Sequence, residues 1–533
     1  MESSKKGFGI FIDRLNKMKC WQILSILFIV NLLLRLFLQH FFKETGIYHD
    51  TADYLNLAYN LYTGKGYVND VWWAMFLKPE QLPRLETLRA PLLPFLLSII
   101  YWLVGVNFFA AKTICIISGS LIPIFTYLIS HLLYQSKPVS LLTAILVSVN
   151  NLLFHCSIAI LTDIPFALLI LITFWFLLRG LESYKIHNFI LCGVFLGLSY
   201  LMRAQGALFV PVVLISLIIK FRIRKSIKPF FYILVCSFLV ISPYLYRNWV
   251  ITGNPLYSTL QRLALQGYFG DMEFFWHSVT SPPGFIPFII SHPLKTMNHT
   301  IQLFWDIYSQ TPECIFIDPI LFVFFIIGIL ITLSQWRIYL PIYLYIIILH
   351  CFLSLTSYEW RYFSSIIPFY LLFTSLGFRY LYLEMNWEGK RYIKYALLVL
   401  ITIPILTNLV TSMANSFKSG DSYFEQSLSV SNFLKKNTKP NEAIMAGVKP
   451  YYYTYCTKRQ TISFPFCDES TFQSILREYN VKYIALSQNE LMYFRKEWLL
   501  VKSPENIKLV YKNKKTDTLV FEVLKSTTPG SMR

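Results

Sequence analysis

Long apolar stretches alternate with short polar clusters along most of this chain. The first stretch, residues 21–42, follows a basic N-terminal segment, and similar runs recur up to about residue 412. A helix needs about 20 mainly apolar residues to cross the hydrocarbon core of a bilayer. The pattern therefore predicts a polytopic α-helical membrane protein. Because the first run lacks a small-residue cleavage site, we expect it to be a retained signal-anchor helix.

The number of spans depends on how residues 91–105 lie. This segment is apolar but short, and it carries two prolines. If it crossed the membrane, the basic cluster at 220–228 would face outward, whereas an interfacial position keeps that cluster in the cytoplasm, as the positive-inside rule favours. The second choice predicts about eleven spans and a cytoplasmic N-terminus, in a multi-pass protein of the cell membrane. The expected spans are 21–42, 107–134, 139–161, 164–181, 188–203, 207–220, 229–247, 319–335, 338–356, 364–384 and 392–412.

Three regions then lie outside the cytoplasm: a first loop at about 43–106, a second loop at about 248–318, and the tail. In the tail, Lys, Asn, Ser and Thr replace the apolar runs, and helix-like SLSVSNFLKKN is followed by strand-like VKYIALS and DTLVFEVL. We expect residues 1–414 to form the transmembrane catalytic part together with both outer loops. Residues 415–533 are expected to form a small extracytoplasmic α/β domain.

The composition agrees with a membrane protein and narrows its partners. Hydrophobic residues make up 55% of the chain and charged residues only 14%, which excludes an ordinary soluble domain. The net charge is +19, but Lys and Arg lie mainly in short loops and in the tail, where they set topology and contact anionic lipid. Nucleic-acid binding is not expected, because no zinc-finger, P-loop or dinucleotide motif occurs. Cys456 and Cys467 lie in the tail, and both a disulfide and two thiols stay open for them.

Candidate chemistry begins directly after the first span, in the segment YHDTADYLNLAYNLY. Helical spacing puts Asp50, Asp53 and Tyr54 on one face. With His49 beside it, a carboxylate at the membrane surface can act as a general base toward an acceptor hydroxyl. The alternative is that Asp50 only caps the helix that follows it, a common role for aspartate. Spacing alone does not decide between the two.

The same loop carries a longer motif, Asp-x-x-x-Tyr-x-x-x-Ala, then Gly-x-Gly-Tyr, then Arg-x-Pro-x-x-Pro. Its residues are Asp50, Tyr54, Ala58, Gly64, Gly66, Tyr67, Arg89, Pro91 and Pro94. The motif resembles the first extracytoplasmic loop of the GT-C superfamily of membrane glycosyltransferases, and within it the protein O-mannosyltransferase and lipid A aminoarabinose transferase group. The resemblance extends through the spans to about residue 380. In that group the first-loop aspartate is catalytic, which implies this role for Asp50.

The resemblance also implies a second acidic residue in the next outer loop, supplied here by Asp163. Its alternative role is the N-cap of the span that follows. A lipid-phosphate leaving group gains negative charge as the glycosidic bond breaks, so the site needs fixed cations. By the family match we favour Arg89 and Arg361 for this phosphate over Arg203 and Arg247, although each arginine has an alternative as an interfacial residue that reaches the headgroups. Relatives often carry a lysine near Arg89, and an arginine can bind phosphate bidentately.

The expected function is a glycosyltransferase that moves a monosaccharide from a polyprenyl-phosphate carrier to an acceptor hydroxyl on the extracytoplasmic face, with inversion and an aspartate base. The acceptor is a glycan, a lipid or a protein. No cofactor is required, because phosphate is a good leaving group, while a divalent cation held by Asp163 stays open. Two alternatives remain. A transporter or flippase for lipid-linked glycans would keep its charges along a central pathway, and an oligosaccharide polymerase or ligase would work mainly through arginines.

Overall fold

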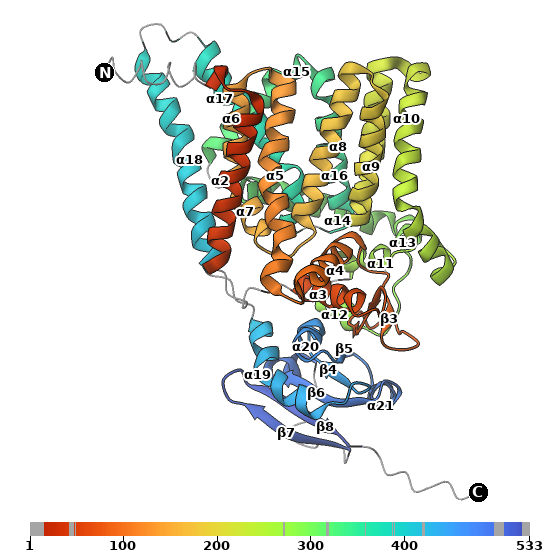
Figure 1. Ribbon diagram of the computed structural model, residues 1–533. Coiled ribbons are helices and arrows are strands. Elements are labelled where there is room, and N and C mark those ends of the chain that lie inside the picture. Colours follow the sequence, from red (N-terminus) through yellow and green to blue (C-terminus); the bar gives the residue numbers. More distant parts are fainter. Residues whose placement is uncertain are drawn as a thin grey trace, which may run out of the picture.

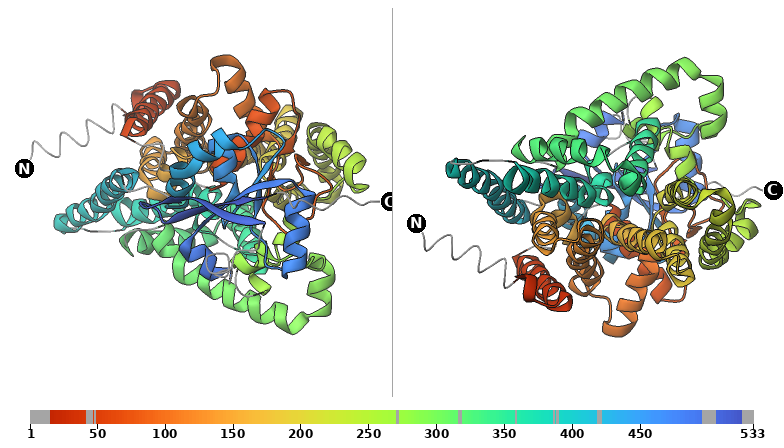
Figure 2. Two further views of the ribbon diagram at one scale, coloured as in Figure 1. Left: turned by 90° about the horizontal axis from the view of Figure 1, so that it is seen from below. Right: turned by 90° about the horizontal axis from the view of Figure 1, so that it is seen from above.

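The computed structural model describes residues 15–41, 47, 49–269, 272–315, 319–357, 359–385, 387, 390–417, 422–494 and 506–524. The described chain is mostly helical. Figure 1 shows a bundle of long helices and, at one end of it, a smaller part that contains the sheet, with the first loop between the two. In the end-on views of Figure 2 the strands of this sheet lie across the middle of the bundle.

The bundle contains the helices that can cross a membrane. Among the described residues, six helices are long and apolar enough, or seven if a pair bent by 59° is counted as one span. The six are α2 (Cys20–Phe41), α5 (Phe108–Tyr134), α8 (Asp163–Ser183), α10 (Phe209–Thr252), α16 (Trp336–Leu355) and α18 (Arg391–Phe417). The bent pair is α6 (Lys137–Val149) and α7 (Asn151–Ser157).

The expected number of eleven spans is not confirmed. The two expected spans 207–220 and 229–247 fall on the two helices that meet within α10 at Arg222, whose conformation is non-helical (φ 63°). Three further helices fall where spans were expected but are short for a crossing. They are α9 (Ile186–Met202), α15 (Pro319–Leu333) and α17 (Ile367–Arg379). The multi-pass class of the protein is confirmed, whereas the exact count stays a prediction.

The first loop folds back on itself through a glycine turn. Gly64 and Gly66 have φ angles of +79° and +87°, which residues with a Cβ rarely adopt, so the Gly-x-Gly pair permits the reversal after α3. The reversal is fixed by Asn60, whose Nδ2 donates to the carbonyl of Val68 at 2.9 Å. The elements of the loop are α3 (His49–Tyr62), β1 (Val68–Asn69), β2 (Val71–Trp72), β3 (Arg84–Leu85) and α4 (Leu92–Val104), with β1 and β3 antiparallel.

The second loop packs against the first. The indole rings of Trp73 and Trp276 stack with centroids 3.9 Å apart, and the backbone N–H of Met75 donates to the carbonyl of Trp276 at 2.9 Å. The second loop has mainly short helices, and α14 runs along the edge of the bundle (Figure 2). Its helices are α11 (Leu260–Leu263), α12 (Met272–His277), α13 (Phe285–Ser291) and α14 (Pro293–Ile315).

The sheet joins the tail to the first loop. It has six strands in the order β2-β5-β4-β6-β8-β7, with parallel pairing from β2 to β6 and antiparallel pairing from β6 to β7. Its edge strand β2 comes from the first loop and pairs with β5, so that Val71 lies opposite Thr461. The tail elements are α19 (Ser422–Asn437), β4 (Ala443–Ala446), α20 (Pro450–Thr457), β5 (Gln460–Ser463), α21 (Glu469–Glu478), β6 (Val481–Ser487), α22 (Gln488–Tyr493), β7 (Ile507–Asn513) and β8 (Thr518–Val523).

The tail is therefore in direct contact with the loop that carries the sequence motif. The hydroxyl of Tyr452 donates to the carbonyl of Ile47 at 2.9 Å, and Nδ2 of Asn56 donates to the carbonyl of Tyr451 at 3.2 Å. Both outer loops and the tail lie at the same end of the bundle (Figure 1). The side of the membrane that this end faces, and the expected boundary at 414/415, stay predictions.

Candidate active site

Asp50 is held between two arginines. It lies in the first turn of α3 and is 7% exposed. Its Oδ1 accepts from Nη2 of Arg89 at 2.6 Å, and its Oδ2 pairs with Nη2 of Arg361 at 2.6 Å. Arg89 comes from the same loop, whereas Arg361 comes from the 3₁₀ helix η4 (Trp360–Ser365), far along the chain. The Asp50 carboxylate therefore connects the first loop to η4, which lies about 300 residues further along the chain.

Asp163 belongs to the same cluster. It is the first residue of α8, whose N-cap is Thr162, so the alternative in which Asp163 itself is the N-cap is wrong. Its carboxylate pairs with Arg203, the C-cap residue of α9, and lies 3.9 Å from Nη1 of Arg361. Arg361 therefore links both aspartates that the sequence singled out. Its Nε also pairs with Glu359 at 2.6 Å.

Aromatic rings cover the guanidinium groups. The guanidinium of Arg89 lies 5.1 Å from the ring centroid of Tyr54, and that of Arg203 lies 4.7 Å from the ring of Tyr362. The hydroxyl of Tyr54 is 3.4 Å from that of Thr162, directly before Asp163. Such rings attract cations and keep water away from their faces. The ion pairs consequently lie in a partly dehydrated site, in which charge interactions are stronger than in water.

Two residues of the expected site, Arg247 and His49, are not among the described ion pairs of this cluster. Arg247 lies outside the ion-pair cluster, because its Nη2 donates to the carbonyl of Tyr67 at 3.1 Å and its guanidinium stacks on the ring of that tyrosine. The Tyr67 hydroxyl in turn donates to the carbonyl of Arg89 at 2.8 Å, so Arg247 is one contact removed from the cluster. His49 begins α3, but its side chain lies outside the described residues.

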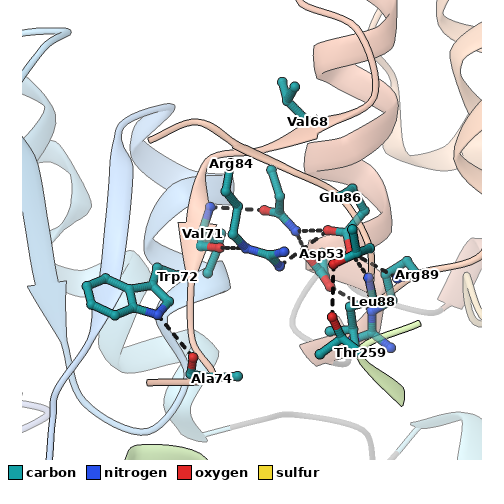
Figure 3. A network of polar contacts seen from close by, with 12 residues as sticks. Asp53, Val68, Val71, Trp72, Ala74, Arg84, Glu86, Leu88, Arg89 and Thr259 are labelled. Atoms are coloured by element: carbon teal, nitrogen blue, oxygen red, sulfur yellow. Dashed lines mark hydrogen bonds and ion pairs between the residues drawn. The ribbon is translucent and has the colours of Figure 1, made fainter. Parts of the chain in front are cut away.

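A second group of buried charges lies directly behind Arg89 (Figure 3). Nε of Arg89 donates to Oδ2 of Asp53 at 2.7 Å, and the backbone N–H of Arg89 donates to Oε1 of Glu86 at 3.0 Å. Asn69 bridges the two acids, since its Nδ2 is 2.9 Å from Asp53 Oδ1 and 2.7 Å from Glu86 Oε2. Arg84 completes the group at 3.3 Å from Glu86.

The pKa values of these two acids are shifted in opposite directions. Asp53 and Glu86 are both fully buried. Burial raises the pKa of Asp53, and the Arg89 guanidinium only partly opposes that rise. Burial also acts to raise the pKa of Glu86, but Arg84 and the hydrogen bonds from Asn69 and the backbone outweigh it, so the pKa of Glu86 is held below its usual value.

The sequence did not identify Asn69, Arg84, Glu86 or Glu359 as site residues. The one available signal was the number of charged residues in an otherwise apolar first loop, because a buried charge persists only when it is paired. The cluster as a whole offers carboxylates that can accept a proton and guanidiniums that can bind an anionic oxygen. Both kinds of group are needed for acyl, phosphoryl or glycosyl transfer away from a charged leaving group.

Comparisons with known proteins show what this chain is similar to. Residues 88–247 match the family model described as dolichyl-phosphate-mannose-protein mannosyltransferase. No curated protein sequence matches the chain. Among solved structures, the chain is similar to ArnT from Cupriavidus metallidurans bound to undecaprenyl phosphate, with 12% identity, a TM-score of 0.57, and 94% of this chain and 98% of that chain covered.

A second similar structure is the oligosaccharyltransferase AglB from Archaeoglobus fulgidus, in complex with an inhibitory peptide and a dolichol-phosphate. It shares 12% identity and a TM-score of 0.58, over 96% of this chain and 75% of that chain. These matches confirm the resemblance to the GT-C superfamily. The chain is a multi-pass membrane protein with the GT-C glycosyltransferase fold.

Proposed function

We propose that this protein transfers a single sugar from a polyprenyl-phosphate donor to a hydroxyl acceptor, with inversion at the anomeric carbon and Asp50 as the general base. The observation that supports this best is the position of Asp50 between Arg89 and Arg361. A base toward the acceptor and cations for the leaving phosphate are the two requirements of such a transfer. The lipid phosphates bound by the similar structures agree with a donor of this class.

The proposed reaction begins when the donor phosphate competes with Asp50 for the two guanidiniums. An arginine binds phosphate through the same two-pronged geometry with which it binds carboxylate. Binding of the donor therefore releases Asp50 from its ion pairs and makes it available to the acceptor. The acceptor oxygen then attacks the anomeric carbon while Asp50 takes its proton. The bond between that carbon and the phosphate oxygen breaks, and polyprenyl phosphate leaves with the electron pair.

Asp163 and Arg203 have a supporting role in this proposal. Asp163 stands beside Arg361, and its ion pair with Arg203 holds the end of α9 against the start of α8. Arg203 and Arg361 come from outside the first loop and add positive charge to the site. We propose that Asp163 orients the acceptor or Arg361, whereas Arg247, which binds Tyr67, supports the loop from outside the cluster.

The reaction as proposed needs no metal ion. A divalent cation requires several oxygen ligands, and no group of three or more His, Cys, Asp and Glu suited to a metal occurs in the described ranges. Asp50 and Asp163 are separated by the guanidinium of Arg361, which a cation would have to displace. The arginines supply the charge that stabilises the leaving phosphate.

The site is proposed to face away from the cytoplasm, at the end of the bundle where both outer loops and the tail gather. Polyprenyl-phosphate donors are lipids, so the bilayer is also a partner. The chemistry accepts a hydroxyl on a protein, a glycan or a lipid, since each presents the same nucleophile to Asp50.

A second candidate is an oligosaccharide ligase. It is favoured by one observation, the engagement of both Asp50 oxygens by arginines, which is compatible with catalysis by guanidiniums alone. The donor of such an enzyme carries an oligosaccharide, whereas the proposed transferase takes a monosaccharide.

The test uses purified protein, a polyprenyl-phosphate monosaccharide labelled in the sugar, and extracts of the cell envelope as acceptor. We expect release of polyprenyl phosphate only when acceptor is present, with the label moved to the acceptor. Transfer from a lipid-linked oligosaccharide but not from the monosaccharide donor would favour the ligase. Movement of the intact labelled lipid across vesicles, with no release of polyprenyl phosphate, would refute both and favour a flippase.

A further inference from the structure

Asp53 and Glu86 behind Arg89 have no part in the reaction described above, although both are fully buried. We propose that Asp53 and Glu86 are positioning residues, which fix the guanidinium of Arg89 in the orientation that binds the donor phosphate. This inference rests on the proposed function, because it gives Arg89 a phosphate to bind. The network is drawn in Figure 3.

Arg89 is held at two separate points. The Asp53 carboxylate binds its Nε, and the Glu86 carboxylate binds its backbone N–H. A free arginine side chain has large rotational freedom, which must be lost when it binds a ligand. With Nε and the backbone both fixed, Nη2 of Arg89 is directed at Asp50 and lies 2.6 Å from its Oδ1.

The two anchoring acids are themselves fixed. Asn69 donates from one nitrogen to both carboxylates, and Arg84 bonds Glu86 and also donates from Nε to the carbonyl of Val71 at 2.9 Å. Two carboxylates that share one amide repel each other, and this repulsion is offset by a guanidinium on each side, Arg84 at Glu86 and Arg89 at Asp53. An arrangement of this kind costs free energy unless every member is paired. All its members come from the first loop.

A rigidly held cation suits the proposed leaving group. Charge stabilisation in an active site depends on donors that are already oriented when the charge develops. Asp53 and Glu86 would therefore act on donor affinity through Arg89, and not on proton removal from the acceptor. Loss of Asp53 or Glu86 should raise the KM for the donor more than it lowers kcat. A loss of folded protein would instead lower the apparent kcat and leave KM unchanged.

The experiment is a double-mutant cycle on lipid-phosphate binding. The dissociation constant of a polyprenyl phosphate is measured in detergent micelles for the parent, Asp53→Asn, Arg89→Ala and the double variant. Asparagine keeps the shape of the side chain but lacks the charge, and it has one acceptor oxygen where Asp53 uses two, for Arg89 and for Asn69. Losing one charge-assisted contact should weaken binding about ten- to a hundred-fold in the parent. In the Arg89→Ala background, Asp53→Asn should change binding less than about twofold.

Glu86→Gln is measured in the same cycle, so that the inference is tested even if Asp53→Asn does not fold, and thermal unfolding monitors all variants. Equal weakening by Asp53→Asn with and without Arg89, or no weakening at all, overturns the positioning role while leaving the proposed donor site in place. Unchanged binding in Arg89→Ala overturns the role of Arg89 in the proposed function, and the inference with it.

Discussion

Arg361 donates to Asp50 across the two halves of the chain, with Nη2 and Oδ2 2.6 Å apart. The same guanidinium lies 3.9 Å from Asp163 and 2.6 Å from Glu359. One side chain thus connects the first loop, the start of α8 and η4. Because a guanidinium presents five N–H donors in a fixed plane, it can bind several acids at once. Arg361 is the residue through which the site is assembled from segments distant in sequence.

Replacing Arg361 should reduce activity strongly. Arg361→Ala removes one cation from the proposed phosphate site, and loss of one such donor typically lowers kcat by about a hundred- to a thousand-fold. Arg361→Lys keeps the charge but cannot bridge Asp50 and Asp163, so it should restore only part of the rate. The measurement is the initial rate of polyprenyl phosphate release. The matched control is Arg337→Ala, an exposed arginine in the first turn of α16, which should keep the parent rate. Parent activity in both arginine-to-alanine variants would contradict the role of Arg361.

The central residues of the cluster could be predicted, because they carry charge where the surrounding sequence is apolar or where the loop motif marks them. Asp50, Arg89, Asp163, Arg203 and Arg361 are all brought together. Their partners are harder to predict. Asn69 and Arg84 lie on strands of only two residues each, which are too short to show alternation of polar and apolar positions.

The pairing of β2 with the sheet of the tail could not be predicted from the sequence either. Strand β2 has only two residues, and its partner β5 lies near the other end of the chain. Nothing local specifies that pairing, which depends on the packing of the whole end of the molecule. The number of spans stays a prediction for a related reason. Hydropathy locates apolar segments, but it does not show whether a short helix such as α9, α15 or α17 crosses the whole membrane.

The proposed topology predicts opposite accessibility for the two ends of the bundle. Lys225 lies in the basic cluster of α10, and Lys508 lies on β7 in the tail, and both side chains are exposed. In a background in which the nine native cysteines are replaced by serine, Lys508→Cys should react with a membrane-impermeant maleimide in intact cells. Lys225→Cys should react only after the cells are permeabilised. Labelling of Lys225→Cys from outside would invert the topology and move the site to the cytoplasmic side.

Lys458 should make stability depend on pH. Burial lowers its pKa from 10.5 to about 8, although its ammonium lies 4.8 Å from the rings of both Tyr59 and Tyr455. Between these two pH values the unfolded chain binds more protons than the folded one, so the free energy of unfolding rises as pH increases from about 8 to 10.5. Below about 8, both states are protonated and the penalty of the buried charge is fully present.

Lys458→Met should remove this dependence, and the variant should be more stable than the parent at pH 7. The measurement is the thermal midpoint of the purified protein at pH 7 and pH 10. Lys436→Met, which changes an exposed lysine of α19, should retain the pH dependence of the parent. A pH dependence in Lys458→Met equal to that of the parent would show that Lys458 is not the group responsible.

Chelation should leave the reaction unaffected. The proposal assigns stabilisation of the leaving phosphate to arginines, so dialysis against EDTA should change the rate of transfer by less than about twofold. Loss of activity that is restored by Mg²⁺ or Mn²⁺ would instead indicate that a cation displaces Arg361 and binds Asp50 and Asp163.

The role of Asp50 is tested most directly by Asp50→Asn in the acceptor-dependent transfer assay. An amide cannot take the acceptor proton, and loss of a general base typically costs about a hundred- to ten-thousand-fold in rate. Asn caps a helix nearly as well as Asp, so a capping role predicts little change. Asp53→Asn cannot serve as a neutral control, because Asp53 binds Arg89. Glu80→Gln makes the same change at an exposed position of the first loop and should keep the parent rate.

The deciding measurement is therefore the rate of polyprenyl phosphate release by Asp50→Asn at saturating donor and acceptor, with binding of the donor lipid measured on the same preparation. We predict that the variant folds, binds the donor lipid and releases polyprenyl phosphate at least about a hundred-fold more slowly than the parent and Glu80→Gln. Release at close to the parent rate would show that the acceptor proton goes elsewhere and that Asp50 is not the base.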